Sequence, residues 1–246
     1  MSGAMSRRSL EISANSLGSA LAAQAGGADR VELCENLAEG GTTPSYGTLA
    51  VARDRLRIPL YVLIRPRGGD FFYDEPELAV MRADIETCVR LGCDGVVIGA
   101  LDADGDVDSA LCRELIAAAG SLGVTFHRAF DAARDQGRAL EAAVALGCER
   151  ILTSGAAAKA WDGADRIATL VAQAAGRIRL MAGAGVTAQN IVALAQRAGV
   201  DELHASAKMP KRSAMRYRNE ALAGLSADWE QSDEQRVREL VQALRA

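Results

Sequence analysis

The stretch Ala25-Gly26-Gly27-Ala28-Asp29-Arg30-Val31-Glu32-Leu33 joins an alanine-rich segment to a short apolar run. A glycine in this place can adopt the left-handed conformation that ends many helices, and the apolar run has the length of a buried strand. The junction therefore predicts a helix that leads directly into a strand. Similar junctions recur at 91–98, 122–126, 146–152 and 198–203.

Working outward from these junctions, we expect helices and strands to alternate along the chain. The expected strands are Ser9–Ser13, Arg30–Glu35, Leu60–Arg65, Gly95–Gly99, Thr125–Arg128, Arg150–Ser154, Ile178–Ala182 and Glu202–Ser206. The expected helices are Leu17–Ala25, Ser45–Leu56, Glu77–Leu91, Ser109–Ala119, Arg138–Leu146, Ala164–Ala174, Ala188–Ala198 and Asp233–Leu244. Such alternation requires parallel strands with helical crossovers. The pattern predicts an α/β protein with a single (β/α)₈ barrel. Lys208–Trp229 is the longest segment without a periodic pattern, and we expect it to lie over the mouth of the barrel.

Composition limits the classes of function. Of the 246 residues, 49% are hydrophobic and 24% are charged, with a net charge of −4, which is typical of a globular chain. An acidic chain has no general attraction for nucleic acid or anionic membranes, and we expect neither as a partner. The start MSGAMSRRS lacks the apolar core of a signal peptide, which indicates a cytoplasmic protein. We expect one domain over residues 5–246, with residues 1–4 an expression remnant.

Charged and polar residues gather where the expected strands end. In a barrel of this class, chemistry takes place at the carboxyl ends of the strands. Glu11, Glu32 and Cys34 alternate along the first two strands so that they point into the upper lumen, and both histidines, His127 and His204, belong to later strand ends. The alternative interpretation is a set of purely structural ion pairs, such as Glu32 with Arg65.

A second group of residues has the properties of an anion site. Arg65 and Arg67 flank a proline after the third strand, and Arg128 follows the fifth. Gly183-Ala184-Gly185 leads from the seventh strand into a helix start, where exposed amide groups favour an anion. We expect Arg65, Arg67, Arg128, Gly183 and Gly185 to bind a small anionic ligand.

Several blocks of sequence resemble the copper homeostasis protein CutC family. They are Gly27–Cys34, Glu39–Ser45, Ile64–Phe71, Thr125–Asp131, Leu152–Gly155 and Met215–Asn219. The resemblance implies a cytoplasmic (β/α)₈ barrel with a role in copper tolerance or handling, and a homodimer or other homo-oligomer. It also implies copper ligation by cysteines at the ends of the first two strands. Cys34 matches the second of these positions, and Ser13 occupies the first.

These observations leave three interpretations open. The first is a cytosolic protein that binds copper(I) through Cys34, with His127 and His204 as further ligands. The second is an enzyme of the isomerase, aldolase or hydrolase type acting on a small anionic metabolite, phosphorylated compounds included. Glu11 or Glu32 would then be the base and His127 the acid or electrophile, or the carboxylates and histidines would hold a hard divalent metal. The third is a structural ion network without a ligand.

Overall fold

The computed structural model describes residues 8–219, 221 and 225–246, so the expected remnant at residues 1–4 lies outside the described residues. Eight parallel strands form a closed barrel in which each strand pairs with the next and β8 returns to β1. They are β1 (Ser9–Ala14), β2 (Arg30–Leu33), β3 (Leu60–Leu63), β4 (Gly95–Ile98), β5 (Gly123–Phe126), β6 (Arg150–Thr153), β7 (Arg179–Gly183) and β8 (Glu202–Ala205). The predicted (β/α)₈ barrel is confirmed.

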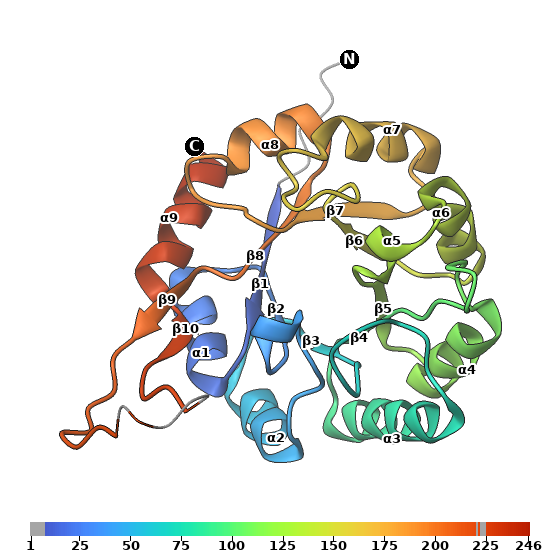
Figure 1. Ribbon diagram of the computed structural model, residues 1–246. Coiled ribbons are helices and arrows are strands. Elements are labelled where there is room, and N and C mark those ends of the chain that lie inside the picture. The colour runs from blue at the N-terminus through green and yellow to red at the C-terminus, as the bar shows by residue number, and fades with distance from the viewer. Residues whose placement is uncertain (1–7, 220, 222–224) are drawn as a thin grey trace.

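Helices form a ring outside the strands (Figure 1). They are α1 (Leu17–Gly26), α2 (Tyr46–Arg55), α3 (Glu75–Leu91), α4 (Ser109–Ala119), α5 (Ala129–Ala132), α6 (Gln136–Ala145), α7 (Ala164–Ala174), α8 (Ile191–Ala198) and α9 (Glu234–Arg245), with a 3₁₀ turn at Leu37–Glu39. The sequence pattern missed the short α5. It also placed the start of α8 three residues early, because Thr187 N–H donates to Asn190 Oδ1 at 2.9 Å and holds this segment in a turn. No helix in the described part of the chain is long and apolar enough to cross a membrane.

The glycine junctions behave as predicted in most copies. Gly27, Gly92 and Gly199 end α1, α3 and α8 in the left-handed conformation, with φ values of 90°, 70° and 67°. The copy at 122–126 differs, because α4 ends at Gly120 and Gly123 is already part of β5. A Cβ on Gly123 would lie 2.2 Å from the Tyr61 hydroxyl, so this glycine makes room for a side chain inside the barrel.

Outward-facing strand residues form the main core with the helices. Leu10, Ile12, Val31 and Ile98 are fully buried there, between the barrel and the helical ring. The alternate residues face the lumen, where Glu11 and Glu32 are buried although they are charged. The lumen is therefore the polar part of this barrel, as the alternation of residue types along β1 and β2 predicts.

The segment after β8 is more regular than expected. Its two ends pair as an antiparallel ribbon, β9 (Lys208–Lys211) with β10 (Trp229–Ser232). The base of this ribbon lies at the barrel mouth, since Lys208, Pro210 and Glu230 line the cavity there. Residues 212–219, which follow β9, project away from the barrel (Figure 1). The base of the ribbon therefore borders the mouth, whereas residues 212–219 do not form the expected cover over it.

Candidate functional site

A cavity of about 1180 Å³ opens at the carboxyl ends of the strands. The predicted site residues that line it are Glu32, Cys34, Arg65, His127, Arg128, Gly185 and His204. These residues come from β2, β8 and the segments after β2, β3, β5 and β7, so the closed barrel brings together side chains that lie far apart in the sequence. Three predicted residues are not part of the lining in the described structure, namely Glu11, Arg67 and Gly183.

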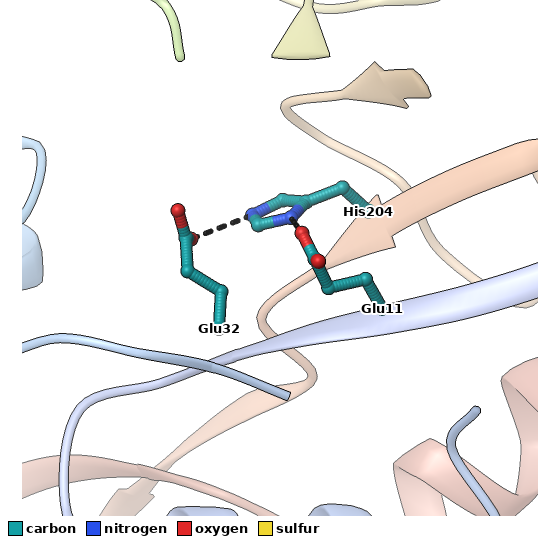
Figure 2. Close-up of side chains that lie close together, drawn as sticks. All are labelled: Glu11, Glu32 and His204. Atoms are coloured by element: carbon teal, nitrogen blue, oxygen red, sulfur yellow. Dashed lines mark hydrogen bonds and ion pairs between the residues drawn. The ribbon is translucent and has the colours of Figure 1, made fainter. Parts of the chain in front are cut away.

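Glu11 and Glu32, which are buried, form a cluster with the partly exposed His204 (Figure 2). The strand register pairs Glu11 with His204 and Ser13 with Glu32, which places the three side chains on adjacent strands. His204 Nδ1 lies 2.8 Å from Glu11 Oε1, and His204 Nε2 lies 3.6 Å from Glu32 Oε2. The imidazole therefore lies between two carboxylates.

The three groups of this cluster differ in pKa. Burial alone would raise the pKa of Glu11, but Arg30 and His204 outweigh it and lower that pKa to about 2. Burial raises the pKa of Glu32 to about 7, although His204 acts in the opposite direction. Burial would lower the pKa of His204, but its hydrogen bond to Glu11 and the charge of Glu32 raise it above its ordinary value of 6.5. Glu11 is thus a fixed anion, and Glu32 changes its protonation state near neutral pH.

A second ion network, which the sequence did not indicate, lies deeper in the lumen. Glu202 accepts hydrogen bonds from Arg30 at 3.0 Å and from Arg150 at 2.8 Å, and Arg30 also pairs with Glu11. The ring of Tyr61 lies 5.1 Å from each of the two guanidinium groups. The interpretation of a structural ion network applies to this lower layer, which fixes Glu11 from below. Arg30 and Glu32 are two residues apart on β2, so their side chains face the same side of the strand. This spacing is the feature of the sequence that could have indicated the network.

Arg65 does not form the expected ion pair with Glu32. Its guanidinium donates to the carbonyl oxygens of Glu39, Gly41 and Gly69 at 2.6–2.8 Å, and it lies 5.0 Å from the centroid of the Phe71 ring. The side chain is only 4% exposed, and no carboxylate of the described residues forms an ion pair with it. The loops after β2 and β3 therefore hold a buried cation at the cavity wall.

Arg67 has a different environment, although it is only two residues away. Its guanidinium pairs with Glu77 and with Asp70, and it lies over the ring of Tyr73. Since Arg67 is outside the cavity lining and its donors are occupied, the geometry does not support its expected role in anion binding. Gly183 is also outside the lining. A Cβ there would lie 2.6 Å from Leu152 and 3.1 Å from His204, so this glycine makes room for His204.

His127 follows β5 and is 4% exposed. Its Nδ1 accepts a hydrogen bond from the backbone N–H of Ala129 at 3.1 Å, which places the proton of the neutral ring on Nε2. Burial, together with the charge of Arg65, lowers the pKa of His127 to about 3. A Cβ on Gly99 would lie 2.6 Å from this ring, so only glycine at that position leaves room for it. His127 is thus a neutral donor at physiological pH and cannot act as a cationic acid.

The loops after β5, β6 and β7 form the opposite rim of the cavity. Arg128 pairs with Asp131 at 2.8 Å and donates to Ser154 Oγ at 2.9 Å, which fixes its guanidinium at the rim. Gly185 and residues 186–189 line the cavity just before α8 begins. The first amide groups of a helix favour an anion. Here Thr187 N–H donates to Asn190 Oδ1 and Ile191 N–H donates to the Thr187 carbonyl, so anion binding at this rim stays a prediction.

Cys34 is the cavity-lining cysteine among the described residues. Its Sγ lies 3.5 Å from Ser13 Oγ, and burial raises the pKa of the thiol to about 12. Cys88, Cys93, Cys112 and Cys148 are buried outside the cavity. The nearby carboxylate and imidazole donors suit a harder metal than copper(I), which prefers thiolates. The donor atoms of Glu11, Glu32 and His204 lie within 4.8 Å of one another and fit a divalent ion better.

Comparisons with known proteins agree with the fold and identify relatives. A family model described as the CutC family matches residues 8–209. The chain is 60% identical over 235 residues to a family protein CutC of Xanthomonas axonopodis pv. citri, covering 96% of this chain and 98% of the relative. It is 51% identical over 220 residues to one from Bacteroides thetaiotaomicron, covering 89% and 88%.

Solved structures give a similar result. The structure of CutC from Streptococcus agalactiae is 38% identical, has a TM-score of 0.78, and covers 81% of this chain and 98% of that one. A phosphoribosylanthranilate isomerase from Thermotoga maritima has a TM-score of 0.58 at 13% identity, covering 97% and 99%, and shows likeness of fold alone.

Proposed function

The chain belongs to the CutC family, and from this premise we propose that its cavity is a general acid–base site acting on a small anionic metabolite. The observation that carries the proposal is the placement of Glu32 beside His204 at the cavity wall, 3.6 Å apart. Each of these groups can exchange a proton with a compound bound in the cavity, whereas 3.6 Å is too long for a hydrogen bond between the two side chains themselves.

The acidity of Glu32 suits this role. A general acid or base is most effective when its pKa is close to the working pH, and burial brings that of Glu32 to about 7. Glu11 accepts the hydrogen bond from His204 Nδ1 and keeps the imidazole oriented toward Glu32. Glu11 is therefore a positioning residue, and Glu32 is the group that takes and returns the proton.

Arg65 supplies the positive charge that favours an anionic substrate. The rest of the cavity lining carries carboxylates as well as cations, and Arg128 is paired with Asp131. Arg65 and Arg128 line the cavity together with the turn at residues 185–189, where amide groups precede α8. Arg65 has no carboxylate partner among the described residues, so its charge is available to a ligand. A compound that carries a phosphate or carboxylate group would be bound by this rim and would extend toward Glu32.

A turnover experiment tests this proposal. The protein is incubated in D₂O with a panel of small phosphorylated and carboxylated metabolites, and each compound is followed by ¹H and ³¹P NMR. We expect the wild type to convert or deuterate at least one compound, and Glu32→Gln to be roughly 100-fold slower or worse. Glu141→Gln, which alters an exposed carboxylate paired with Arg177, is the matched control. Equal rates in wild type and Glu32→Gln would contradict the proposal, as would a wild type that acts on no compound.

Copper(I) binding at Cys34 is the second candidate, since the relative from Streptococcus agalactiae is described by copper homeostasis. It ranks second because the buried thiol must lose a proton before it can bind copper, and Ser13 offers a hydroxyl where a second thiolate would be needed. An anaerobic competition with a chromogenic copper(I) chelator tests it. Cys34→Ser should abolish binding while Cys112→Ser retains it, and equal affinity in wild type and Cys34→Ser would rule out this site.

The resemblance also implies a cytoplasmic location and a homo-oligomer, and we propose both for this chain. The oligomeric state can be measured directly by size-exclusion chromatography with light scattering. A single species with the mass of one chain, 25.8 kDa, would contradict it.

A further inference from the structure

Two buried N–H groups at the cavity wall lack an acceptor within the described structure, namely Arg65 Nε and His127 Nε2. Each side chain is 4% exposed, and both line the same cavity. The Phe71 ring lies against both, 5.0 Å from the Arg65 guanidinium carbon and 5.1 Å from the centroid of the His127 ring. Buried polar groups in a native structure normally have a partner, so these two donors point to a missing acceptor. The Tyr73 hydroxyl, a third buried polar atom without a partner among the described residues, lies near Arg65 but outside the cavity lining.

The two donors differ in charge, and the difference is informative. Ala129 N–H occupies the Nδ1 lone pair of His127, which makes this ring a neutral donor through Nε2. Arg65 supplies a fixed positive charge, because carbonyl oxygens hold its other nitrogens and no described carboxylate neutralises it. A neutral donor beside a cation fits an oxygen atom that gains negative charge, and the apolar Phe71 ring strengthens both interactions by excluding water.

We propose that Arg65 and His127 form an oxyanion-binding pair, and that the substrate is a carbonyl compound with an acidic hydrogen on the carbon next to the carbonyl. This inference rests on the proposed function, since it takes Glu32 as the base. Glu32 lies on β2, whereas His127 follows β5 across the lumen, so a small molecule can lie between the base and the oxyanion donors.

The proton transfer is balanced without a further reactant. The Glu32 carboxylate takes the proton from the carbon, and the electrons of the broken C–H bond form a carbon–carbon double bond. The electrons of the carbonyl double bond move to the oxygen, which becomes an enolate and accepts hydrogen bonds from Arg65 Nε and His127 Nε2. Glu32 then returns the proton to the same carbon. If that carbon carries a hydroxyl group whose proton moves to the enolate oxygen, the proton held by Glu32 can instead go to the former carbonyl carbon, and the hydroxyl oxygen becomes the new carbonyl oxygen. This chemistry is that of an isomerase, or of the enolate-forming step of an aldolase.

A pair of probes separates this inference from the proposed function. Both 2-phosphoglycolate and glycerol 3-phosphate carry a phosphate, but only the first has a carboxylate that can take the place of the enolate oxygen. We expect isothermal titration calorimetry to show at least tenfold tighter binding of 2-phosphoglycolate by the wild type. His127→Phe should remove most of this preference, whereas His127→Gln, which keeps an N–H donor, should retain part of it.

A spectroscopic readout accompanies the binding measurement. The chain has two histidines, so its ¹⁵N imidazole spectrum is simple to assign. The His127 Nε2–H proton should move downfield when 2-phosphoglycolate binds and stay in place with glycerol 3-phosphate. Circular dichroism of each variant shows whether it is folded, and Arg65→Lys serves as a second variant, since it keeps the charge but loses the Nε donor.

The outcomes are distinct. Equal affinity for the two probes, no binding of 2-phosphoglycolate, or an unchanged preference in His127→Phe and Arg65→Lys would overturn the oxyanion pair. None of these results decides the acid–base function, which is judged by the turnover of Glu32→Gln. Loss of turnover in Glu32→Gln together with equal affinity for the probes would therefore retain the function and reject the inference.

Discussion

His204 Nδ1 lies 2.8 Å from Glu11 Oε1, in a part of the barrel from which water is almost excluded. The barrel closes where β1 pairs with β8, and the register of this pair places Glu11 and His204 side by side on neighbouring strands. Glu11 is also paired with Arg30 from below. The negative charge of Glu11 therefore stabilises both Arg30 and His204. Its hydrogen bond with Nδ1 also leaves Nε2 as the nitrogen of His204 that faces Glu32.

Replacing the Glu11 carboxylate should strongly destabilise the fold. In Glu11→Gln, the buried Arg30 loses one of its two carboxylate partners, and His204 loses the group that raises its pKa. Removing one partner of a buried ion pair costs about 3–5 kcal/mol. Urea unfolding at pH 7 should show a loss of this size. Glu141→Gln, at an exposed ion pair, should leave the midpoint nearly unchanged, and similar midpoints for the two variants would contradict this account.

The stability of the protein should fall as pH rises toward neutrality because of Glu32. Its pKa is raised from an ordinary 4.5 to about 7, so the folded state binds this proton more tightly than the unfolded state does. The resulting stabilisation is fully present below pH 4.5 and is lost as pH rises through 7. Relative to Glu32→Gln, the wild type should lose on the order of 3 kcal/mol between pH 4.5 and 8.

Urea unfolding of both proteins at several pH values measures this difference. Glu11 does not interfere, since its lowered pKa of about 2 gives stability that is lost only as pH falls below 4.5. Parallel stability curves for wild type and Glu32→Gln would show that Glu32 titrates normally.

The two histidines should titrate differently. Burial and the charge of Arg65 lower the pKa of His127 to about 3, whereas the interactions of His204 with Glu11 and Glu32 raise its pKa above 6.5. NMR of the imidazole groups should show one ring that stays neutral between pH 5 and 8 with its proton on Nε2, and a second ring that stays protonated to a higher pH than a free imidazole. His127→Gln assigns the signals. A His127 ring that becomes protonated near pH 6 would be inconsistent with its environment here.

Gly99 and Gly47 form a matched pair of alanine substitutions. Gly99→Ala would place a Cβ 2.6 Å from the His127 ring. The Cβ added by Gly47→Ala, in α2, would have no heavy atom within 4 Å. Gly99→Ala should cost about 1–3 kcal/mol and shift the His127 Nε2–H signal. Gly47→Ala should be neutral or stabilise the protein by up to about 1 kcal/mol, because alanine has the higher helix propensity. Thermal unfolding checks both, and equal effects would show that Gly99 is not required for space.

The position of the site at the strand ends could be predicted from sequence, but its pairings could not. Arg65 and Arg67 flank one proline and carry the same charge, which gave no reason to separate them. In the folded chain, Arg65 is held by carbonyl groups of the loops after β2 and β3, while Arg67 pairs with Glu77 in α3. The partner of each guanidinium depends on where distant loops pack, and local sequence does not contain that information.

The glycine-to-apolar junctions by themselves determined the order of helices and strands, since helix ends and buried strands are encoded within a few neighbouring residues. Alternation along β1 and β2 likewise determined that Glu11 and Glu32 face the lumen. Only the tertiary structure decided that His204 lies between these two carboxylates and that Arg65 and His127 share one space beside Phe71. Those relationships arise when the barrel closes and its loops pack, because closure brings β8 against β1 across more than 190 residues of chain.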